Sequence, residues 1–272
     1  MARGESLVNE QKKPKALVVG LSIVALGILL TAGLVAAANA NGSPVRGALT
    51  AAPPAGPAAK WFPTPIRHVV TVVLENEEAT SVWSQGPYEV SLADKYAFTA
   101  EGYAVTHPSE PNYLALSGGS VFGRSGTDAY TVIPNASIAD LLELRGLSWG
   151  EFAQSMPHPC DATDAYPYMV KHNPFVFYQD IVQNTSRCDA HVLNFSSWNA
   201  DVASGNIPNY AFITPNMLND GHDTSTSYAD AWLEGWLQPL LSKPFAASTL
   251  FIVTWDEGAT NAGYTVGNVT LG

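Results

Sequence analysis

Basic residues are scarce in this chain, which has 13 Lys and Arg against 24 Asp and Glu and only 14% charged residues overall. Four of the basic residues lie within residues 1–40, which leaves nine of them against 22 acidic residues in the remainder. A surface this acidic repels phosphate backbones, and no basic stripe with interleaved aromatic side chains is present. We therefore expect no nucleic-acid partner. The hydrophobic content of 46% is nevertheless ample for a sizeable folded core.

Cysteine is also nearly absent. The two cysteines, Cys160 and Cys188, are too few for a disulfide-rich scaffold or for a four-thiolate zinc site. If the chain is exported, they predict a single disulfide bond, and two buried free thiols are the alternative.

Charge is missing altogether from the apolar run 16–38, which follows Lys12, Lys13 and Lys15. The small residues Ala38-Asn39-Ala40 then resemble a cleavage site. Residues 1–40 are therefore predicted to be a signal peptide or a signal anchor, with the rest of the chain on the extracytoplasmic side. Cleavage would give a secreted protein, and retention would anchor it at the outer face of the cell membrane.

Residues 41–65 are rich in Ala, Pro and Gly and predict a linker, so the folded domain is expected at 66–272. Within this domain, apolar runs at 68–74, 210–214 and 249–255 show no polar alternation. Such runs are typical of parallel strands buried on both faces. Helical patterns at 137–146 and 227–241 lie between them. The sequence therefore predicts an α/β fold with a mostly parallel central sheet.

Polar residues follow each of the three predicted strands, at the sheet edge where α/β proteins bind ligands. Carboxylates gathered there repel one another unless a cation or shared protons intervene. Oxygen ligands with imidazoles nearby suit one divalent ion, Ca²⁺, Mg²⁺, Mn²⁺ or Zn²⁺, although such acidic pairs also occur in solvated turns. The residues are Glu75, Asn76, Asp220, His222, Asp223, Asp256 and Glu257.

Two further segments carry candidate residues. Ser109 stands just before a predicted helix that has Pro111 in its first turn, so its hydroxyl lies among free backbone N–H groups that suit a phosphate oxygen. A plain N-cap serine is the alternative. His172 lies in the segment Lys-His-Asn-Pro-Phe, which by itself is most simply a structural turn.

Five motifs occur in the order VVTVVLEN, HPSEPNYLALSGG, KHNPF, NDGHD and FIVTWDEG. Together they resemble the bacterial phosphoesterase family, which contains secreted acid phosphatases and phospholipase C enzymes. The resemblance spans about residues 66–258. It implies an alkaline-phosphatase-like α/β/α sandwich with a divalent metal ion at the carboxyl edge of the sheet.

The resemblance also implies residue roles. Ser109 is similar to the family nucleophile, which contacts the metal and forms a phosphoserine intermediate. His172 and His222 are similar to the histidines that hold the phosphoryl oxygens or protonate the leaving group, and protonated histidines there would give an acidic pH optimum. The remaining implied metal ligands are Glu75, Asn76, Asp256 and Glu257. Further residues of the same motifs, expected at the site without a defined role, are His107, Asn112, Asp220 and Asp223.

The implied activity is that of an exported, metal-dependent phosphoesterase. The short loops between the motifs favour an acid phosphatase acting on phosphomonoesters over a phospholipase C acting on glycerophospholipids. Family members usually continue well past the Trp-Asp-Glu-Gly motif, whereas this sequence ends at Gly272. A third hypothesis is therefore an inactive, membrane-tethered scaffold that binds phosphate.

Overall fold

The structure, a computed structural model, describes residues 65–99 and 102–259. The predicted leader at 1–40 lies outside the described residues, as does the linker except for its last residue. Within the described ranges, no helix has both the length and the apolar character needed to cross a membrane.

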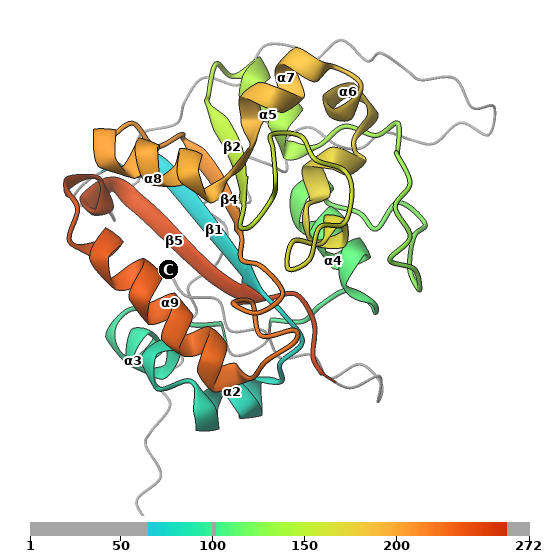
Figure 1. Cartoon of the computed structure of the whole chain (residues 1–272). Helices are drawn as coiled ribbons and strands as arrows, with labels where there is room; N and C mark the ends of the chain where they lie inside the picture. Colours follow the sequence, from blue (N-terminus) through green and yellow to red (C-terminus); the bar gives the residue numbers. More distant parts are fainter. Residues whose placement is uncertain (1–64, 100–101, 260–272) are drawn as a thin grey trace, which may run out of the picture. The chain divides into compact units, whose positions relative to one another are not determined.

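Five parallel strands form the central sheet, in the order β3-β2-β4-β1-β5 (Figure 1). Three of them match the predicted strands, namely β1 (His68–Leu74), β4 (Tyr210–Thr214) and β5 (Thr249–Trp255). The other two, β2 (Trp149–Ala153) and β3 (Val192–Asn194), were not predicted. Because all five strands run in one direction, their carboxyl ends share one edge of the sheet.

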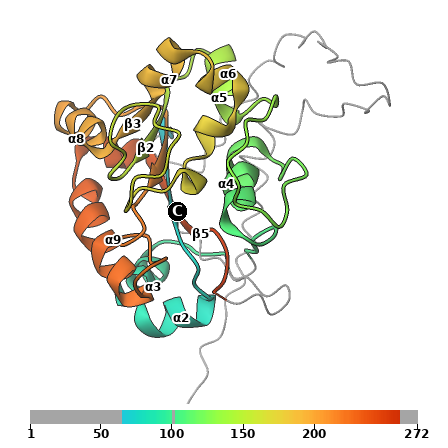
Figure 2. The same cartoon turned by 45° about the vertical axis from the view of Figure 1, so that its right-hand side comes forward.

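Helices cover both faces of the sheet, as the two rotated views show (Figures 1 and 2). One face carries α2 (Ala79–Gln85), α3 (Pro87–Lys95), α8 (Phe195–Ser204) and α9 (Thr226–Leu241). The other carries α4 (Ser109–Gly118), α5 (Ile138–Leu144), α6 (Gln179–Val182) and α7 (Thr185–His191). The described residues also form the 3₁₀ helices η1 (Val170–His172), η2 (Pro174–Phe177) and η3 (Pro244–Ser248).

Alternate residues of β1 divide between two hydrophobic cores. Val70, Val72 and Leu74 belong to the core under α9, whereas Val73 belongs to the core under α4. This two-sided burial explains why the strand has no polar alternation. The fold is therefore the α/β/α sandwich that the sequence predicted.

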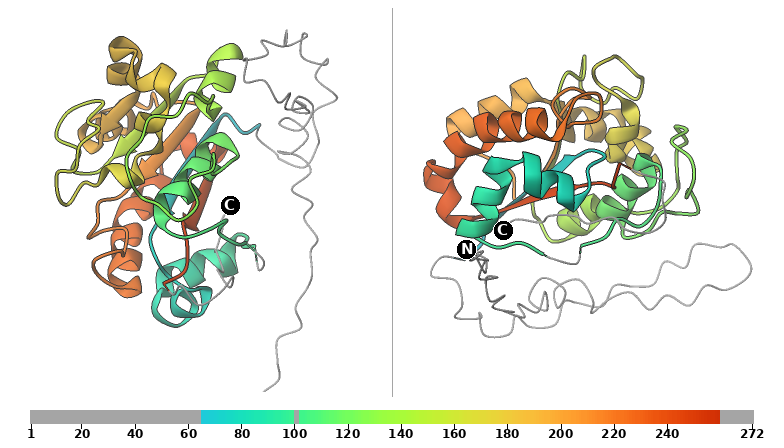
Figure 3. Two further views of the ribbon diagram at one scale, coloured as in Figure 1. Left: turned by 90° about the vertical axis from the view of Figure 1, so that its right-hand side faces the viewer. Right: turned by 90° about the horizontal axis from the view of Figure 1, so that it is seen from below.

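Backbone hydrogen bonds bring the ends of the central strands together. The Asp256 N–H donates to the Leu74 carbonyl at 2.9 Å, and the Glu75 N–H donates to the Asp220 carbonyl at 2.8 Å. The first residues after β1 and β5 and the loop after β4 are thus fixed side by side. The two further views show this edge of the domain from other directions (Figure 3).

Helix α4 begins at Ser109. The sequence predicted instead a helix that begins one residue after this serine. Pro108 occupies the N-cap position, and no side chain caps this end of the helix. The alternative that Ser109 is a plain N-cap serine is therefore wrong. Its hydroxyl is available for contacts outside the helix.

A disulfide bond joins Cys160 and Cys188, whose Cα atoms lie 5.3 Å apart. It links the segment after β2 to α7, next to the core under α4. The predicted disulfide is confirmed, and the alternative of two free thiols is wrong.

A buried carboxyl group away from the sheet edge gives a pH-dependent stability. Glu89 on α3 is fully buried and accepts a hydrogen bond from Trp255 Nε1 at 3.1 Å, while its second oxygen has no partner. Burial, together with the nearby Asp230, raises the pKa of Glu89 to about 8. Because the folded-state pKa is raised, the stability associated with protonated Glu89 is present below about pH 4.5 and is lost as the pH rises towards 8.

The substitution Glu89→Gln is therefore expected to flatten the dependence of stability on pH. Above pH 8 the variant should be more stable than the parent by on the order of 2 kcal/mol, because no buried charge forms. Urea melts at pH 5 and pH 8.5 measure the difference. If the free energy of unfolding changed equally between pH 5 and pH 8.5 in parent and variant, a raised Glu89 pKa would be contradicted.

Candidate functional site

A pocket of about 510 Å³ opens at the carboxyl edge of the sheet. Its lining comes from the segments after β1, β4 and β5, from the start of α4 and from η1. Its lining includes Asn76, His107, Ser109, Asp128, Lys171, His222 and Glu257.

Ser109 lies at the base of this pocket and is only 2% exposed. Its Oγ is 3.0 Å from Glu75 Oε2 and 3.2 Å from Glu257 Oε1, and it donates towards both. One hydroxyl has one hydrogen, so both acceptors cannot be satisfied at the same time. The serine is thus held between two carboxylates that would each take its proton.

Two further motif residues support Glu257. His107 Nδ1 lies 2.6 Å from Glu257 Oε2, and Asn112 Nδ2 donates to the same oxygen at 3.4 Å. Asn112 Oδ1 also accepts hydrogen bonds from the backbone N–H groups of Val105 and Thr106, at 2.9 and 3.1 Å. It therefore ties the segment that carries His107 to α4.

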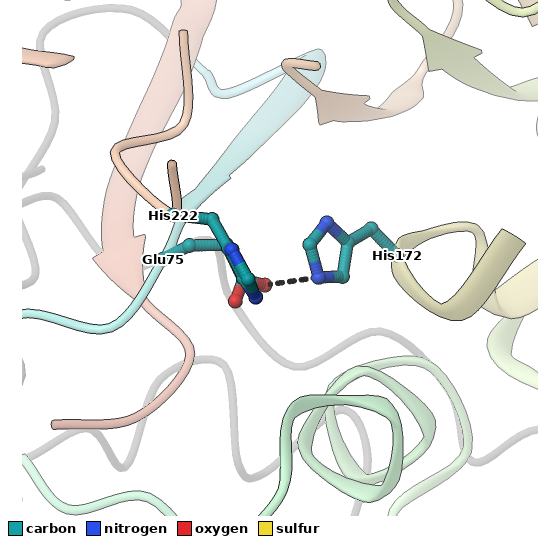
Figure 4. Close-up of side chains that lie close together, drawn as sticks. All are labelled: Glu75, His172 and His222. Atoms are coloured by element: carbon teal, nitrogen blue, oxygen red, sulfur yellow. Dashed lines mark ion pairs between the residues drawn. The ribbon is translucent and has the colours of Figure 1, made fainter. Parts of the chain in front are cut away.

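His172 is buried between two carboxylates. Its Nε2 lies 3.2 Å from Glu75 Oε1 (Figure 4). Its Nδ1 lies 3.3 Å from Asp220 Oδ2. The ring stacks on Tyr113, with 5.2 Å between the ring centroids. The orientation of the imidazole is thus fixed on three sides.

His222 is held in a similar way. Its Nδ1 lies 2.8 Å from Asp223 Oδ1, and its Nε2 lies 3.0 Å from Lys171 Nζ. Lys171 Nζ is also 3.6 Å from Asp128 Oδ2. No role was predicted for Lys171 or Asp128 from the sequence. Lys171 belongs to the KHNPF motif, whereas Asp128 lies in a loop outside the five motifs.

The backbone at the pocket is unusual at two positions. Asn76 has a φ of 61°, in the left-handed region, and its N–H donates to Asp256 Oδ1 at 3.1 Å. Gly221 has a φ of 101°, and a Cβ atom there would lie 3.1 Å from the Trp255 ring. Such conformations persist where surrounding contacts fix them, and they are frequent at functional sites.

Burial raises the pKa of every acidic residue at the centre of the cluster. The pKa of Asp256 rises to about 8 through burial and the neighbouring Glu257, and those of Glu257 and Asp220 rise to about 7, mainly through burial. Burial and the charges of Asp256 and Asp220 raise the pKa of Glu75 well above its usual value. The cluster is therefore short of positive charge.

Unpaired atoms at His172 fit a bound cation. Glu75 Oε1, His172 Nε2 and Asp220 Oδ2 are buried and form no hydrogen bond of normal geometry, although the two histidine nitrogens lie 3.2 and 3.3 Å from the carboxylates. Burial, then the charges of Lys171 and His222, lower the pKa of His172 well below its usual value. This differs from the protonated histidine expected from the sequence. A neutral imidazole has one N–H, so one of its nitrogens directs a lone pair at a carboxylate, and a cation or a shared proton resolves that conflict.

Two overlapping groups of side chains could hold a divalent metal ion. Glu75, His172 and His222 offer ligand atoms within 4.8 Å of one another (Figure 4). The set implied by the resemblance shares Glu75 with this group and adds oxygen donors from Asn76, Ser109, Asp256 and Glu257. The structure brings all of these residues to the same sheet edge. His172 and His222 are additional candidate ligands, whereas the sequence predicted that they contact the phosphoryl oxygens or the leaving group.

Comparisons with known proteins identify the family of the chain. Residues 82–264 match the Phosphoesterase family. An acid phosphatase of Aspergillus fumigatus is 38% identical over 62% of this chain and 40% of its own length. A phosphatidylinositol-3-phosphatase of Mycobacterium tuberculosis is 34% identical over 76% of this chain and 68% of its own length.

The acid phosphatase of Aspergillus niger is 34% identical over 82% of this chain and 55% of its own length. The chain thus spans about half the length of the fungal relatives it matches. A solved structure from Vibrio parahaemolyticus, described as a protein in the alkaline phosphatase superfamily, has a TM-score of 0.54 and 14% identity over 76% of this chain and 60% of its own. It supports the fold. On the family match and these identities, the chain belongs to the Phosphoesterase family.

Proposed function

We propose that this protein is an exported, metal-dependent phosphoesterase that hydrolyses phosphomonoesters through a phosphoserine intermediate. The observation that carries the proposal is the Ser109 hydroxyl, which points into the carboxylate cluster at the base of the pocket and donates towards Glu75 and Glu257. The relatives named as acid phosphatases support the monoester substrate, and the relative named as a phosphatidylinositol-3-phosphatase makes phosphoinositides a candidate class. The disulfide bond suits export to an oxidising compartment.

The first half of the reaction forms the phosphoserine. Ser109 Oγ attacks phosphorus, and its proton passes to the carboxylate of Glu257, whose Oε1 lies 3.2 Å from Oγ. The bond between phosphorus and the ester oxygen breaks, and the alcohol leaves with a proton from His222. Asp223, at 2.8 Å from Nδ1, orients that ring.

The second half regenerates the serine. A water molecule attacks phosphorus and gives a proton to His222, the bond between phosphorus and Oγ breaks, and Oγ recovers its proton from Glu257. Inorganic phosphate leaves. Glu110 N–H at the start of α4 already donates to Asp128, and Pro111 has no N–H, so the Ser109 N–H is the backbone donor proposed to favour a charged phosphoryl oxygen.

One divalent metal ion is proposed at the carboxylate cluster, with Glu75, Asn76, Asp256, Glu257 and Ser109 as its ligands. When bound, it would neutralise the carboxylates and lower the pKa of the serine hydroxyl. Asp220 holds His172 beside this cluster, where the imidazole faces either the ion or a phosphoryl oxygen.

Hydrolysis of p-nitrophenyl phosphate by the chain tests the proposal. We expect turnover that a chelator abolishes and that one of Ca²⁺, Mg²⁺, Mn²⁺ or Zn²⁺ restores, measured from pH 4 to 9. Diacylglycerol release from phosphatidylcholine vesicles, faster than any monoester turnover, would instead indicate a phospholipase C. A folded, metal-loaded protein with neither activity would favour the inactive phosphate-binding scaffold.

A further inference from the structure

We propose that Lys171 binds a phosphoryl oxygen in the pocket and makes the site selective for phosphomonoesters over phosphodiesters. This inference rests on the proposed function and names a residue that determines its specificity.

The position of Lys171 is the first support. It lies on η1 at the pocket wall, and its side chain is only 15% exposed. Among the described residues that line the pocket, it is the single lysine or arginine. Ser109 and Glu257 line the same pocket, so the ammonium group and the serine hydroxyl face one shared space.

The contacts of Lys171 hold it in that space. Asp128 Oδ1 accepts a hydrogen bond from the Glu110 N–H at 2.9 Å, which fixes Asp128 at the first turn of α4. Its other oxygen, Oδ2, is 3.6 Å from Lys171 Nζ, and His222 Nε2 lies 3.0 Å from the same nitrogen. An ammonium group has three hydrogens. Asp128 accepts one of them, and the protonated His222 that the proposed mechanism needs has no free lone pair at Nε2, so the other hydrogens of Lys171 remain for a ligand. Asp128 is a positioning residue in this arrangement.

Charge explains why this lysine would select among substrates. A phosphomonoester carries a charge of about −1.5 to −2 at neutral pH, whereas a phosphodiester carries one negative charge and one fewer free oxygen. Glu77 and Asp128, which are not among the proposed metal ligands, also line the pocket and repel both kinds of substrate. A fixed ammonium group next to His222 therefore favours the substrate with the additional anionic oxygen. If Lys171 only neutralised the carboxyl groups, its loss would affect both substrates equally.

The test compares metal-loaded parent protein with Lys171→Met, Lys171→Arg and a control, Lys95→Met. Lys95 is exposed at the end of α3 and does not line the pocket. We expect Lys171→Met to lower kcat/KM for p-nitrophenyl phosphate by roughly 10- to 100-fold, the range for a hydrogen bond to a charged group. The value for bis(p-nitrophenyl) phosphate should change by less than about threefold, and Lys171→Arg should restore part of the monoester activity. Equal losses for both substrates, or no loss for the monoester, would overturn the proposal.

Binding of inorganic phosphate, measured by calorimetry, separates this inference from the proposed function. A parent protein that binds phosphate but hydrolyses no ester would defeat the proposed function alone. In that case a dissociation constant at least about tenfold weaker in Lys171→Met still supports the lysine assignment. An unchanged dissociation constant, or a parent protein that binds no phosphate, overturns it. Thermal melts of each variant show whether the fold is retained.

Discussion

Replacing Ser109 by Ala is expected to lower the turnover of p-nitrophenyl phosphate by at least about 1,000-fold, because the variant lacks the atom that bonds to phosphorus. The fold should be retained, since the hydroxyl caps no helix and its hydrogen-bond partners are carboxyl groups of the site, among them Glu75 and Glu257. Binding of inorganic phosphate should therefore survive. Steady-state kinetics and calorimetry measure the two quantities.

A matched control for this variant lies on the same helix. Ser117 is also buried in α4, but its Oγ contacts Tyr178 and the Tyr113 carbonyl in the hydrophobic core. The substitution Ser117→Ala should leave kcat within about threefold of the parent value, because a buried side-chain hydrogen bond mainly affects stability. Full activity in Ser109→Ala would remove the serine from the proposed mechanism.

Replacing Glu75 by Gln is expected to have the largest effect on metal binding. Glu75 belongs both to the group with His172 and His222 and to the set implied by the family resemblance. Loss of an outer-shell partner already costs up to about 100-fold in metal affinity, so loss of a direct ligand should cost at least that much. Titration of the parent and the variant with Ca²⁺, Mg²⁺, Mn²⁺ and Zn²⁺ measures the change.

The same substitution should stabilise the protein when the metal has been removed. Burial and two neighbouring carboxyl groups raise the pKa of Glu75, so stability in the chelated protein is lost as the pH rises above the usual Glu range. In chelator at pH 8, Glu75→Gln should therefore melt at a higher temperature than the parent. Glu234→Gln on the exposed side of α9 is the control and should change neither melting nor metal binding. Unchanged affinity in Glu75→Gln for every ion would place the metal site elsewhere.

The sequence was least informative about strands β2 and β3. β2 contains Gly150 and Glu151, which are both poor strand formers, and β3 has three residues. Glu151 is nevertheless fully buried, where Thr214 Oγ1 donates to it at 2.8 Å. Burial against a partner from β4 decides the conformation of β2, and local propensity does not record such a partner.

Some features of the site could be predicted from the sequence, and others could not. The acidic residues after β1 and β5 could be placed at one edge because parallel strands end together, and Ser109 could be placed near α4 because Pro111 marks the first turn of a helix. The pairing of Asp220 with His172, and of Asp128 with Lys171, could not be predicted. Those partners lie in loops, whose paths depend on packing against the rest of the domain.

The sequence by itself determined the sandwich architecture, the edge of the sheet that carries the polar residues and the family, because hydrophobic pattern and motif order are properties of the chain. Only the tertiary structure decided that the Ser109 hydroxyl lies between two carboxyl groups and that His172 is too deeply buried to hold a proton readily. It also placed a lysine opposite the acidic cluster. Distances, burial and charge between segments remote in the chain set these features, and they exist only once the segments pack together.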